Sequence, residues 1–266
     1  MLSLKKIVIQ DFRNIRFQEI AFSPNLNCIS GNNGEGKTNL MDAIWYLSMG
    51  KSALASSDRD NFRHGTESFA ISGTYSMPSG PDARFSVGVC TNGEKKFRRD
   101  DRTYSRIADH IGVLPVVMVS PSDISLVGES GDNRRRFVNS VLSQLDRNYL
   151  SCVQQYNRLL SQRNSALKGE TPDEALLDVL DERMGECAVS IHAARKRFAS
   201  ELVSPVKEYY SSLSGGGEEV SISFHSDLDS RPLAEILKAN RRKDLFLKYT
   251  SAGVHRDDFV FGMNGY

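Results

Sequence analysis

The sequence has few cysteines and no paired arrangement of them. Its 266 residues contain four cysteines, which stand far apart at Cys28, Cys90, Cys152 and Cys187. Disulfide frameworks and zinc sites need cysteines, or cysteines and histidines, at short characteristic spacings. The spacing therefore argues against both and indicates reduced thiols.

Long apolar runs and an excess of one charge are also missing. No apolar run approaches the roughly 20 residues that span a bilayer, and residues 1–10 alternate like a strand instead of resembling a signal peptide. We therefore expect a cytoplasmic protein. The 34 basic and 33 acidic residues leave a net charge of +1. Any site for DNA or another polyanion must then be a local patch.

One segment has the pattern of a phosphate-binding loop, with two flanking glycines followed by lysine and threonine. An apolar segment at 26–30 precedes it and is expected to be a strand, and helical spacing follows over 39–47. The glycines let backbone amides turn toward a phosphate, and the helix start adds its positive dipole end. We expect an ATP site formed by Gly31, Asn32, Asn33, Gly34, Glu35, Gly36, Lys37, Thr38 and Asn39.

Two side chains of this loop have specific expected roles. Lys37 is placed to reach the β- and γ-phosphate oxygens, and the Thr38 hydroxyl is placed to bind Mg²⁺. The alternative is a glycine-rich turn that only joins a strand to a helix. Such a turn needs neither the Gly-Lys-Thr sequence nor three glycines.

The remaining chain divides into a β-rich and a helical part. Alternation predicts a strand pair over 2–22, broken at 11–14, a hairpin over 69–89, and another hairpin at Asn92-Gly93. The continuous apolar run 114–119 predicts a strand buried on both faces.

From 133 to 213 the pattern is helical, and helices of about 15, 20 and 40 residues fit it. Breaks are expected near Asp146 and at 169–172, where Thr171 is a candidate cap and Pro172 a candidate first helical residue. Pro205 predicts a bend or an end. A strand at 220–224, a helix at 232–249 and a strand at 259–261 follow.

The groups that hydrolyse ATP are not evident. Hydrolysis needs a second apolar strand that ends in a carboxylate, and no segment fits that pattern. Residues 213–218 resemble the signature of ATP-binding-cassette proteins, but a strand pattern follows them, so we expect an ordinary helix-to-strand turn. The chain stops just after Asn264-Gly265, a hairpin signal without its second strand. A fragment that does not hydrolyse ATP alone is the expectation.

Several motifs together resemble the landmarks of the RecF family of recombination mediators, which is similar in its head domain to the SMC proteins. They occur in the family's order along the whole chain, at 12–14, 31–44, 120–123, 134–137 and 253–258. The resemblance implies an α/β P-loop NTPase fold of the ABC/SMC-head type, with an antiparallel β segment and an inserted helical lobe. It implies an ATP-binding head at 1–122, a helical lobe at 123–249 and a return to the head at 250–266.

The resemblance also implies a function. Members would form ATP-dependent homodimers that bind DNA at single-strand/double-strand junctions and, with RecO and RecR, assist the loading of RecA in recombination, repair, replication and the SOS response. Arg13 matches a family position near the nucleotide. After Ser52 the family usually carries an aromatic residue and then arginine, where this chain has Ala53-Leu54.

Four basic clusters are candidate DNA contacts. They lie at 95–99, 134–136, 195–197 and 241–243. The favoured one comprises Arg134, Arg135 and Arg136, because it coincides with a family landmark and lies at a helix start, where arginine opposes the dipole. The structural alternative for each cluster is a solvated charged face.

Two other classes of protein remain as alternatives. A P-loop kinase or small-molecule NTPase would share the loop, but such enzymes alternate short strands and helices throughout. A coiled-coil scaffold with a degenerate nucleotide site would share the long helices. The intact Lys37-Thr38 pair argues against the scaffold.

Overall fold

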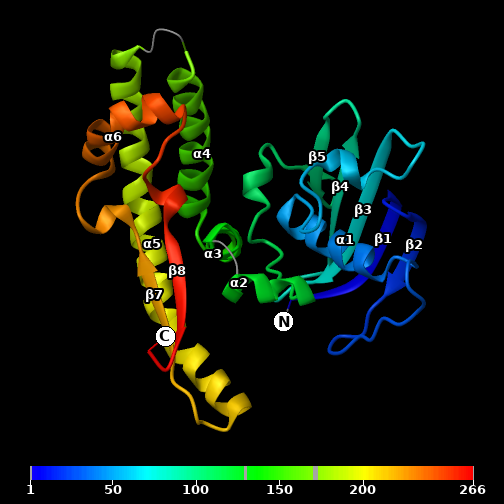
Figure 1. Ribbon diagram of the computed structural model, residues 1–266. Coiled ribbons are helices and arrows are strands. Elements are labelled where there is room, and N and C mark those ends of the chain that lie inside the picture. The colour runs from blue at the N-terminus through cyan, green and yellow to red at the C-terminus, as the bar shows by residue number, and fades with distance from the viewer. Residues whose placement is uncertain (1, 129–130, 170–172, 266) are drawn as a thin grey trace. The chain divides into compact units, whose positions relative to one another are not determined.

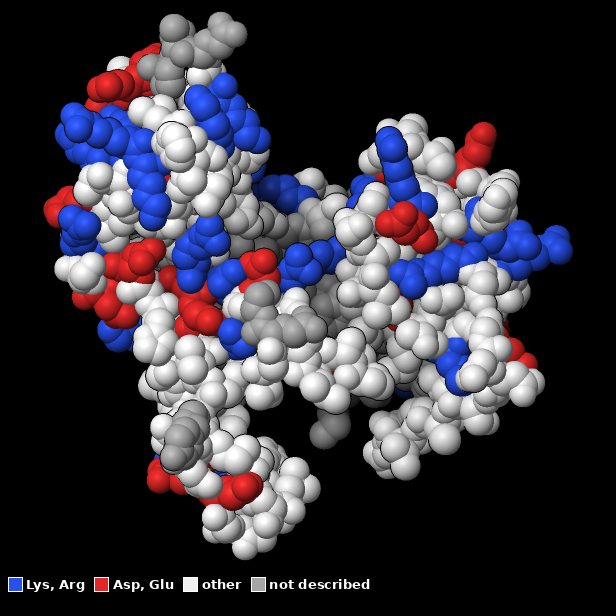
Figure 2. Space-filling view, in the orientation of Figure 1, with Lys and Arg blue, Asp and Glu red and all other residues white. Residues whose placement is uncertain are grey.

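The computed structural model describes residues 2–128, 131–169 and 173–265 (Figure 1). The chain divides into two compact units, Met1–Met118 and Val119–Tyr266. On the face shown in Figure 2, basic and acidic side chains both occur, as the near-zero net charge predicts. No field of a single sign covers that face.

The first unit is built on a six-stranded antiparallel sheet with the order β2-β1-β3-β4-β5-β6. One helix, α1 (Lys37–Met49), packs against this sheet, and the 3₁₀ turns η1 (Asp58–Asn61) and η2 (Ile107–Asp109) lie in the connections. The strands are β1 (Ser3–Phe12), β2 (Ile15–Ala21), β3 (Ser68–Ser76), β4 (Ala83–Cys90), β5 (Lys95–Arg99) and β6 (Arg102–Thr103). The predicted strand pair and both predicted hairpins are confirmed.

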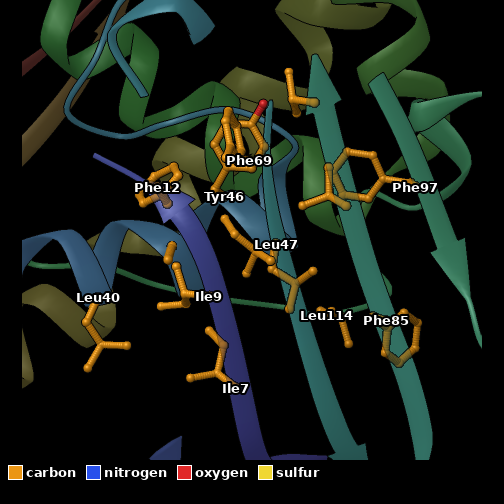
Figure 3. Packing of buried hydrophobic residues seen from close by; sticks show 14 of the residues in the cluster. Ile7, Ile9, Phe12, Leu40, Tyr46, Leu47, Phe69, Phe85, Phe97 and Leu114 are labelled. Carbon is orange, nitrogen blue, oxygen red and sulfur yellow. The ribbon is translucent and has the colours of Figure 1, made fainter. Parts of the chain in front are cut away.

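Alternation along the strands places one face of the sheet in the core. Ile7 and Ile9 of β1 are fully buried, and Leu40 and Leu47 of α1 belong to the same cluster (Figure 3). Phe69 lies 5.2 Å from Phe12 and 5.3 Å from Tyr46 between ring centroids, both in edge-on geometry. This core fixes α1, and therefore the residue at which α1 begins, against the sheet.

Two predicted strands are not formed. The segments 26–30 and 114–119 have no strand assignment, and Leu26, Val117 and Val119 are 87%, 73% and 81% exposed. A strand is stable only when a neighbour satisfies its backbone N–H and C=O groups. Among the described residues, no strand pairs with either segment. Leu26, Val117 and Val119 therefore remain at the surface, whereas Leu114 is buried in the core of the first unit.

The second unit is mainly helical. It contains η3 (Pro121–Ile124), α2 (Ser125–Gly128), α3 (Gly131–Leu145), α4 (Arg147–Leu167), α5 (Glu174–Ser214), η4 (Asp227–Asp229), α6 (Leu233–Leu247) and η5 (Val254–Arg256). Helices α3, α4 and α5 have 15, 21 and 41 residues, which confirms the predicted lengths. A two-stranded antiparallel sheet joins β7 (Val220–His225) to β8 (Asp258–Met263).

The helix ends follow local sequence rules. Asp146 caps α4 as the predicted break requires, and Asp173 caps α5 by accepting from the amides of Ala175 and Leu176. The candidate cap Thr171 and first-turn Pro172 lie outside the described residues. Pro205 lies inside α5, which continues beyond it.

The helix-to-strand turn after α5 is confirmed. Gly215 ends α5 in the left-handed conformation, with φ of 77°, and β7 begins five residues later at Val220. Residues 250–266 lie in the second unit, where β8 pairs with β7. The described elements do not alternate strand and helix throughout, unlike those expected of a small-molecule kinase.

Candidate nucleotide-binding site

The glycine-rich loop between residue 31 and α1 has the backbone of a phosphate cradle. Gly31, Gly34 and Gly36 have φ values of 152°, 87° and 99°, in a region that residues with a side chain rarely adopt. The segment 31–35 is exposed. A Cβ added at Gly34 would have no atom within 4 Å, so the loop apex faces open space.

The start of α1 is open to an anion. Gly36 is the N-cap, and among the described residues no side chain caps this helix start. The first-turn amides of an uncapped helix, together with its dipole, form a site for phosphate. Nor does an acidic residue occupy the first turn of α1. The residues present therefore fit the phosphates of a nucleotide.

Charged side chains hold the loop closed on itself. The Nζ of Lys37 donates to the carbonyl oxygens of Gly31 and Asn32, each at 2.7 Å. The carboxylate of Glu35 accepts from the backbone amide and the side-chain amide of Asn32, each at 2.9 Å. Lys37 thus lies over the loop, and Thr38 is exposed beside it. These positions are compatible with the expected contacts of Lys37 with phosphate and of Thr38 with Mg²⁺. When bound, Mg²⁺ would neutralise part of the phosphate charge.

Arg13 lies beside the loop with its guanidinium already engaged. It donates to Asn61 Oδ1 and Asn39 Oδ1 at 3.1 Å, and to Ser52 Oγ at 3.0 Å. It also lies 3.0 Å from Oδ2 of the fully buried Asp42. Contact between Arg13 and a nucleotide stays a prediction, since the structure shows Arg13 joining the β1–β2 turn to α1.

Sequence reasoning missed two polar residues next to the loop. Asn14 donates from Nδ2 to the carbonyl oxygen of Gly34 at 2.8 Å. Asp42 accepts from Ser52 Oγ and from the Ala53 amide, both at 2.7 Å, which fixes the chain after α1. Asp42 lies at a position of α1 that the helical spacing assigns to the core. A charged residue at such a position was the sequence signal for a buried polar contact. Leu54, which stands where the family usually has arginine, is 44% exposed.

The favoured DNA cluster divides into paired and unpaired arginines. Arg134 forms a two-pronged ion pair with Asp258, through Nε at 2.8 Å and Nη2 at 3.0 Å. Arg135 donates to the Asp257 carbonyl and pairs with Asp132. Arg136 is exposed, with no interaction among the described residues. DNA contact by this cluster stays a prediction, and Arg136 is the member most available for it.

The other basic clusters also contain structural members. Lys95 pairs with Asp58 at 2.9 Å, and Arg195 is buried against Asp257 at 2.6 Å. Arg241 pairs with Asp178 and Asp181, each at 2.7 Å. These cations stabilise the fold, and their neighbours Arg98, Arg197 and Arg242 are among the cluster members exposed to solvent.

The His-Arg-Asp-Asp segment does not form a shared catalytic site. His255 bonds to the Tyr156 hydroxyl at 2.9 Å and to the Thr250 carbonyl at 3.1 Å, and burial lowers its pKa. Burial raises the pKa of Asp257, which faces Arg195, whereas Asp258 faces Arg134. The segment begins in the turn η5 and not on a strand. His255, Asp257 and Asp258 therefore meet α4, α5 and α3 respectively, and Arg256 stacks on Tyr249.

The described residues contain neither a metal-ion cluster nor a membrane-spanning helix. Within residues 2–128, 131–169 and 173–265, no group of three or more His, Cys, Asp or Glu side chains could hold a metal ion. In the same ranges, every helix is too short or too polar to cross a membrane. All four cysteines are free thiols.

Comparisons with known proteins identify the fold and the family. A family model described as "AAA domain" matches residues 6–186. The solved structure of the recombination mediator protein RecF with ATP, from the RecFOR pathway, superposes with a TM-score of 0.92 at 29% identity and covers 100% of this chain and 74% of that one. An Smc head domain from Pyrococcus furiosus, at 16% identity and a TM-score of 0.50, shares the fold over 84% of this chain. The mixed α/β P-loop fold with a long helical insert is thereby confirmed.

The curated relatives agree with the structural match. The DNA replication and repair protein RecF of Phocaeicola vulgatus is 39% identical over 99% of this chain and 71% of its own length. The protein of the same name from Porphyromonas gingivalis is 41% identical over 98% of this chain and 72% of its own length. The chain therefore belongs to the RecF family of DNA replication and repair proteins.

Proposed function

We propose that this chain binds ATP with Mg²⁺ at residues 31–39 and uses the bound nucleotide to form a homodimer that grips DNA. The observation that carries the proposal is the uncapped start of α1 beneath a three-glycine loop, with the Lys37 ammonium held over it. A solved relative with the same fold is described as RecF-ATP, which supports ATP binding by this chain.

The DNA substrate in this proposal is a gapped or junction DNA. In this proposal the chain acts with RecO and RecR and assists RecA loading in the cytoplasm. A solved relative described as a recombination mediator of the RecFOR pathway and curated relatives described as DNA replication and repair proteins support the general role. The exposed Arg136 would provide the phosphate contact, since no carboxylate within the described residues pairs with it. Basic patches of this kind, and not the net charge, would supply the salt-dependent binding.

Nucleotide binding is tested by titration with a fluorescent ATP analogue and Mg²⁺. Lys37→Met removes a charge-assisted contact to phosphate and is expected to weaken binding about 100-fold. Lys96→Met is the matched control, because Lys96 is an exposed lysine of the same unit that pairs with Glu94. Equal affinities of the two variants would contradict the proposed site.

DNA binding is tested by fluorescence anisotropy with gapped DNA over a series of salt concentrations, with and without ATP. Arg136→Ala is expected to lower the salt slope by about 1, as the loss of one phosphate contact does. Arg147→Ala is the control, an exposed arginine at the start of α4. If Arg136→Ala leaves the salt dependence of DNA affinity unchanged, Arg136 does not contact DNA phosphate.

A further inference from the structure

The turn that joins β1 to β2 lies beside the phosphate-binding loop in a constrained conformation. Asp11 and Arg13 have φ values of 52° and 53°, which non-glycine residues seldom adopt. Two backbone bonds hold the turn to the segment after η1, from Arg13 N to Asn61 O at 2.8 Å and from Arg63 N to Asp11 O at 3.0 Å. Phe12 between them is fully buried. The turn is therefore a fixed platform.

Asn14, the last residue of this turn, joins the apex of the loop to α1. Its Nδ2 donates to the Gly34 carbonyl at 2.8 Å, and its Oδ1 accepts from Asn39 Nδ2 at 2.7 Å. Asn39 Oδ1 in turn accepts from Arg13. These partners fix the orientation of the Asn14 side-chain amide. In the reverse orientation its oxygen would face the Gly34 carbonyl oxygen, and its NH₂ group would face the NH₂ group of Asn39.

The space beside Gly36 is filled by the same side chain. A Cβ at Gly36 would lie 2.8 Å from Oδ1 of Asn14. Asn14 therefore touches the loop at its apex, at its last glycine and, through Asn39, at the first turn of the helix. The contacts of Glu35 with Asn32 hold the first half of the loop from within, and Asn14 holds the second half from outside.

We propose that Asn14 is a positioning residue of the nucleotide site, which fixes Gly34 and Gly36 so that the loop amides and the α1 start are arranged before phosphate arrives. This inference rests on the proposed function, namely that the loop binds ATP. A loop that is ordered before binding loses less conformational entropy when the ligand binds. The dissociation constant is therefore lower. The effect belongs to Asn14 because Arg13 beside it faces Asp42 and Ser52 and does not contact the loop apex.

Two substitutions separate the parts of this role. Asn14→Ala removes both hydrogen bonds and is expected to weaken binding of the fluorescent ATP analogue about tenfold. Asn14→Asp keeps the shape and the acceptor toward Asn39, but it places a carboxylate oxygen against the Gly34 carbonyl. It is expected to weaken binding more than alanine does. Asn92→Ala is the matched control, because Asn92 is a turn asparagine of the same unit whose side chain also makes a local hydrogen bond, accepting from the Glu94 backbone amide.

Hydrogen exchange of the nucleotide-free chain gives a second readout that does not depend on binding. Asn14→Ala and Asn14→Asp are both expected to speed amide exchange over residues 31–36, with the exchange of β1 and β3 unchanged. Asn92→Ala should leave the loop unchanged. If the wild-type chain binds ATP and both Asn14 variants match it in affinity and loop exchange, the positioning role is wrong. If the wild-type chain binds no nucleotide, the proposed function fails, and loop exchange alone still decides whether Asn14 orders the loop.

Discussion

At Gly36 the backbone conformation and the space beside it both require glycine. Its φ is 99°, and an added Cβ would lie 2.8 Å from Asn14 Oδ1. Gly80 has a similar φ of 89° but has no atom within 4 Å of an added Cβ. Alanine at Gly80 therefore introduces backbone strain alone, whereas alanine at Gly36 introduces backbone strain and a steric clash.

We expect alanine at either glycine to lower the free energy of unfolding by about 1–2 kcal/mol through backbone strain. Gly36→Ala should lower the free energy of unfolding more than Gly80→Ala does, because its added Cβ displaces Asn14. For the same reason it should also weaken ATP binding. Urea denaturation and nucleotide titration of both variants measure the difference. Similar losses of stability with intact ATP affinity would show that the space beside Gly36 has no role.

His110 makes the stability of the first unit dependent on pH. It is fully buried, its Nε2 lies 2.7 Å from the Leu47 carbonyl, and burial lowers its pKa. The unfolded chain therefore binds a proton more readily than the folded one, and stability falls as pH drops below about 6.5, by up to about 1.4 kcal/mol per pH unit. His110→Gln can keep the donor to Leu47 without the titration.

The measurement is urea denaturation of both proteins between pH 7.5 and pH 5. The wild-type chain should lose more stability over this range than His110→Gln, although His255, whose pKa burial also lowers, titrates in both. Superimposable pH profiles would mean that His110 does not contribute to acid destabilisation.

The three long elements of the helical unit meet at one buried arginine. Arg163 of α4 is fully buried and donates to Asp181 of α5 at 2.6 Å and to Asp244 of α6 at 2.7 Å. It also donates to Thr250 at 2.9 Å, just after α6. Removing one partner of a buried ion pair leaves the other charge uncompensated.

Arg163→Met is accordingly expected to lower the free energy of unfolding by about 3–5 kcal/mol. Arg197→Met, on the exposed pair with Glu201, should change it by less than about 1 kcal/mol. Urea denaturation of the two methionine variants tests the contrast. A small loss for Arg163→Met would show that apolar packing replaces the ion pair at no cost.

Elements with a local pattern were predictable from the sequence, and elements that need a distant neighbour were not. The alternation of β1 and β3 and the spacing of α5 are written into consecutive residues. The apolar run 114–119 has the composition of a buried strand, yet Val117 is exposed because no described strand lies beside it. Strand formation depends on pairing, which composition does not contain.

The candidate site shows the same division. The loop was recognisable because its glycines and Lys37 are contiguous. The contact between Asn14 and Gly34 spans 20 residues and depends on how the β1–β2 turn folds against α1. Arg134 and Asp258 are 124 residues apart, so no local pattern could show that the arginine is already paired.

At the scale of the molecule, the described residues form two hydrophobic cores that share no residue. One joins the antiparallel sheet to α1, and the other joins α3, α4, α5 and α6 to β8. Arg163 lies in the second unit, within the helical lobe. Destabilisation introduced there should therefore remain within that unit.

Hydrogen exchange followed by mass spectrometry tests this independence. Arg163→Met is expected to speed exchange in α4, α5 and α6 while β1 and β3 keep the exchange rates of the wild-type chain. Faster exchange across both cores would show instead that the two units unfold as one cooperative structure.

The segments 26–30 and 114–119, which have no strand assignment, also affect how this chain behaves in bulk. Its mean hydropathy of −0.38 suggests a chain that water solvates well. Leu26 and Val117 are nevertheless 87% and 73% exposed, and exposed apolar side chains favour association between molecules. The colloidal stability of the isolated chain is therefore expected to depend on such exposed side chains more than on its average composition.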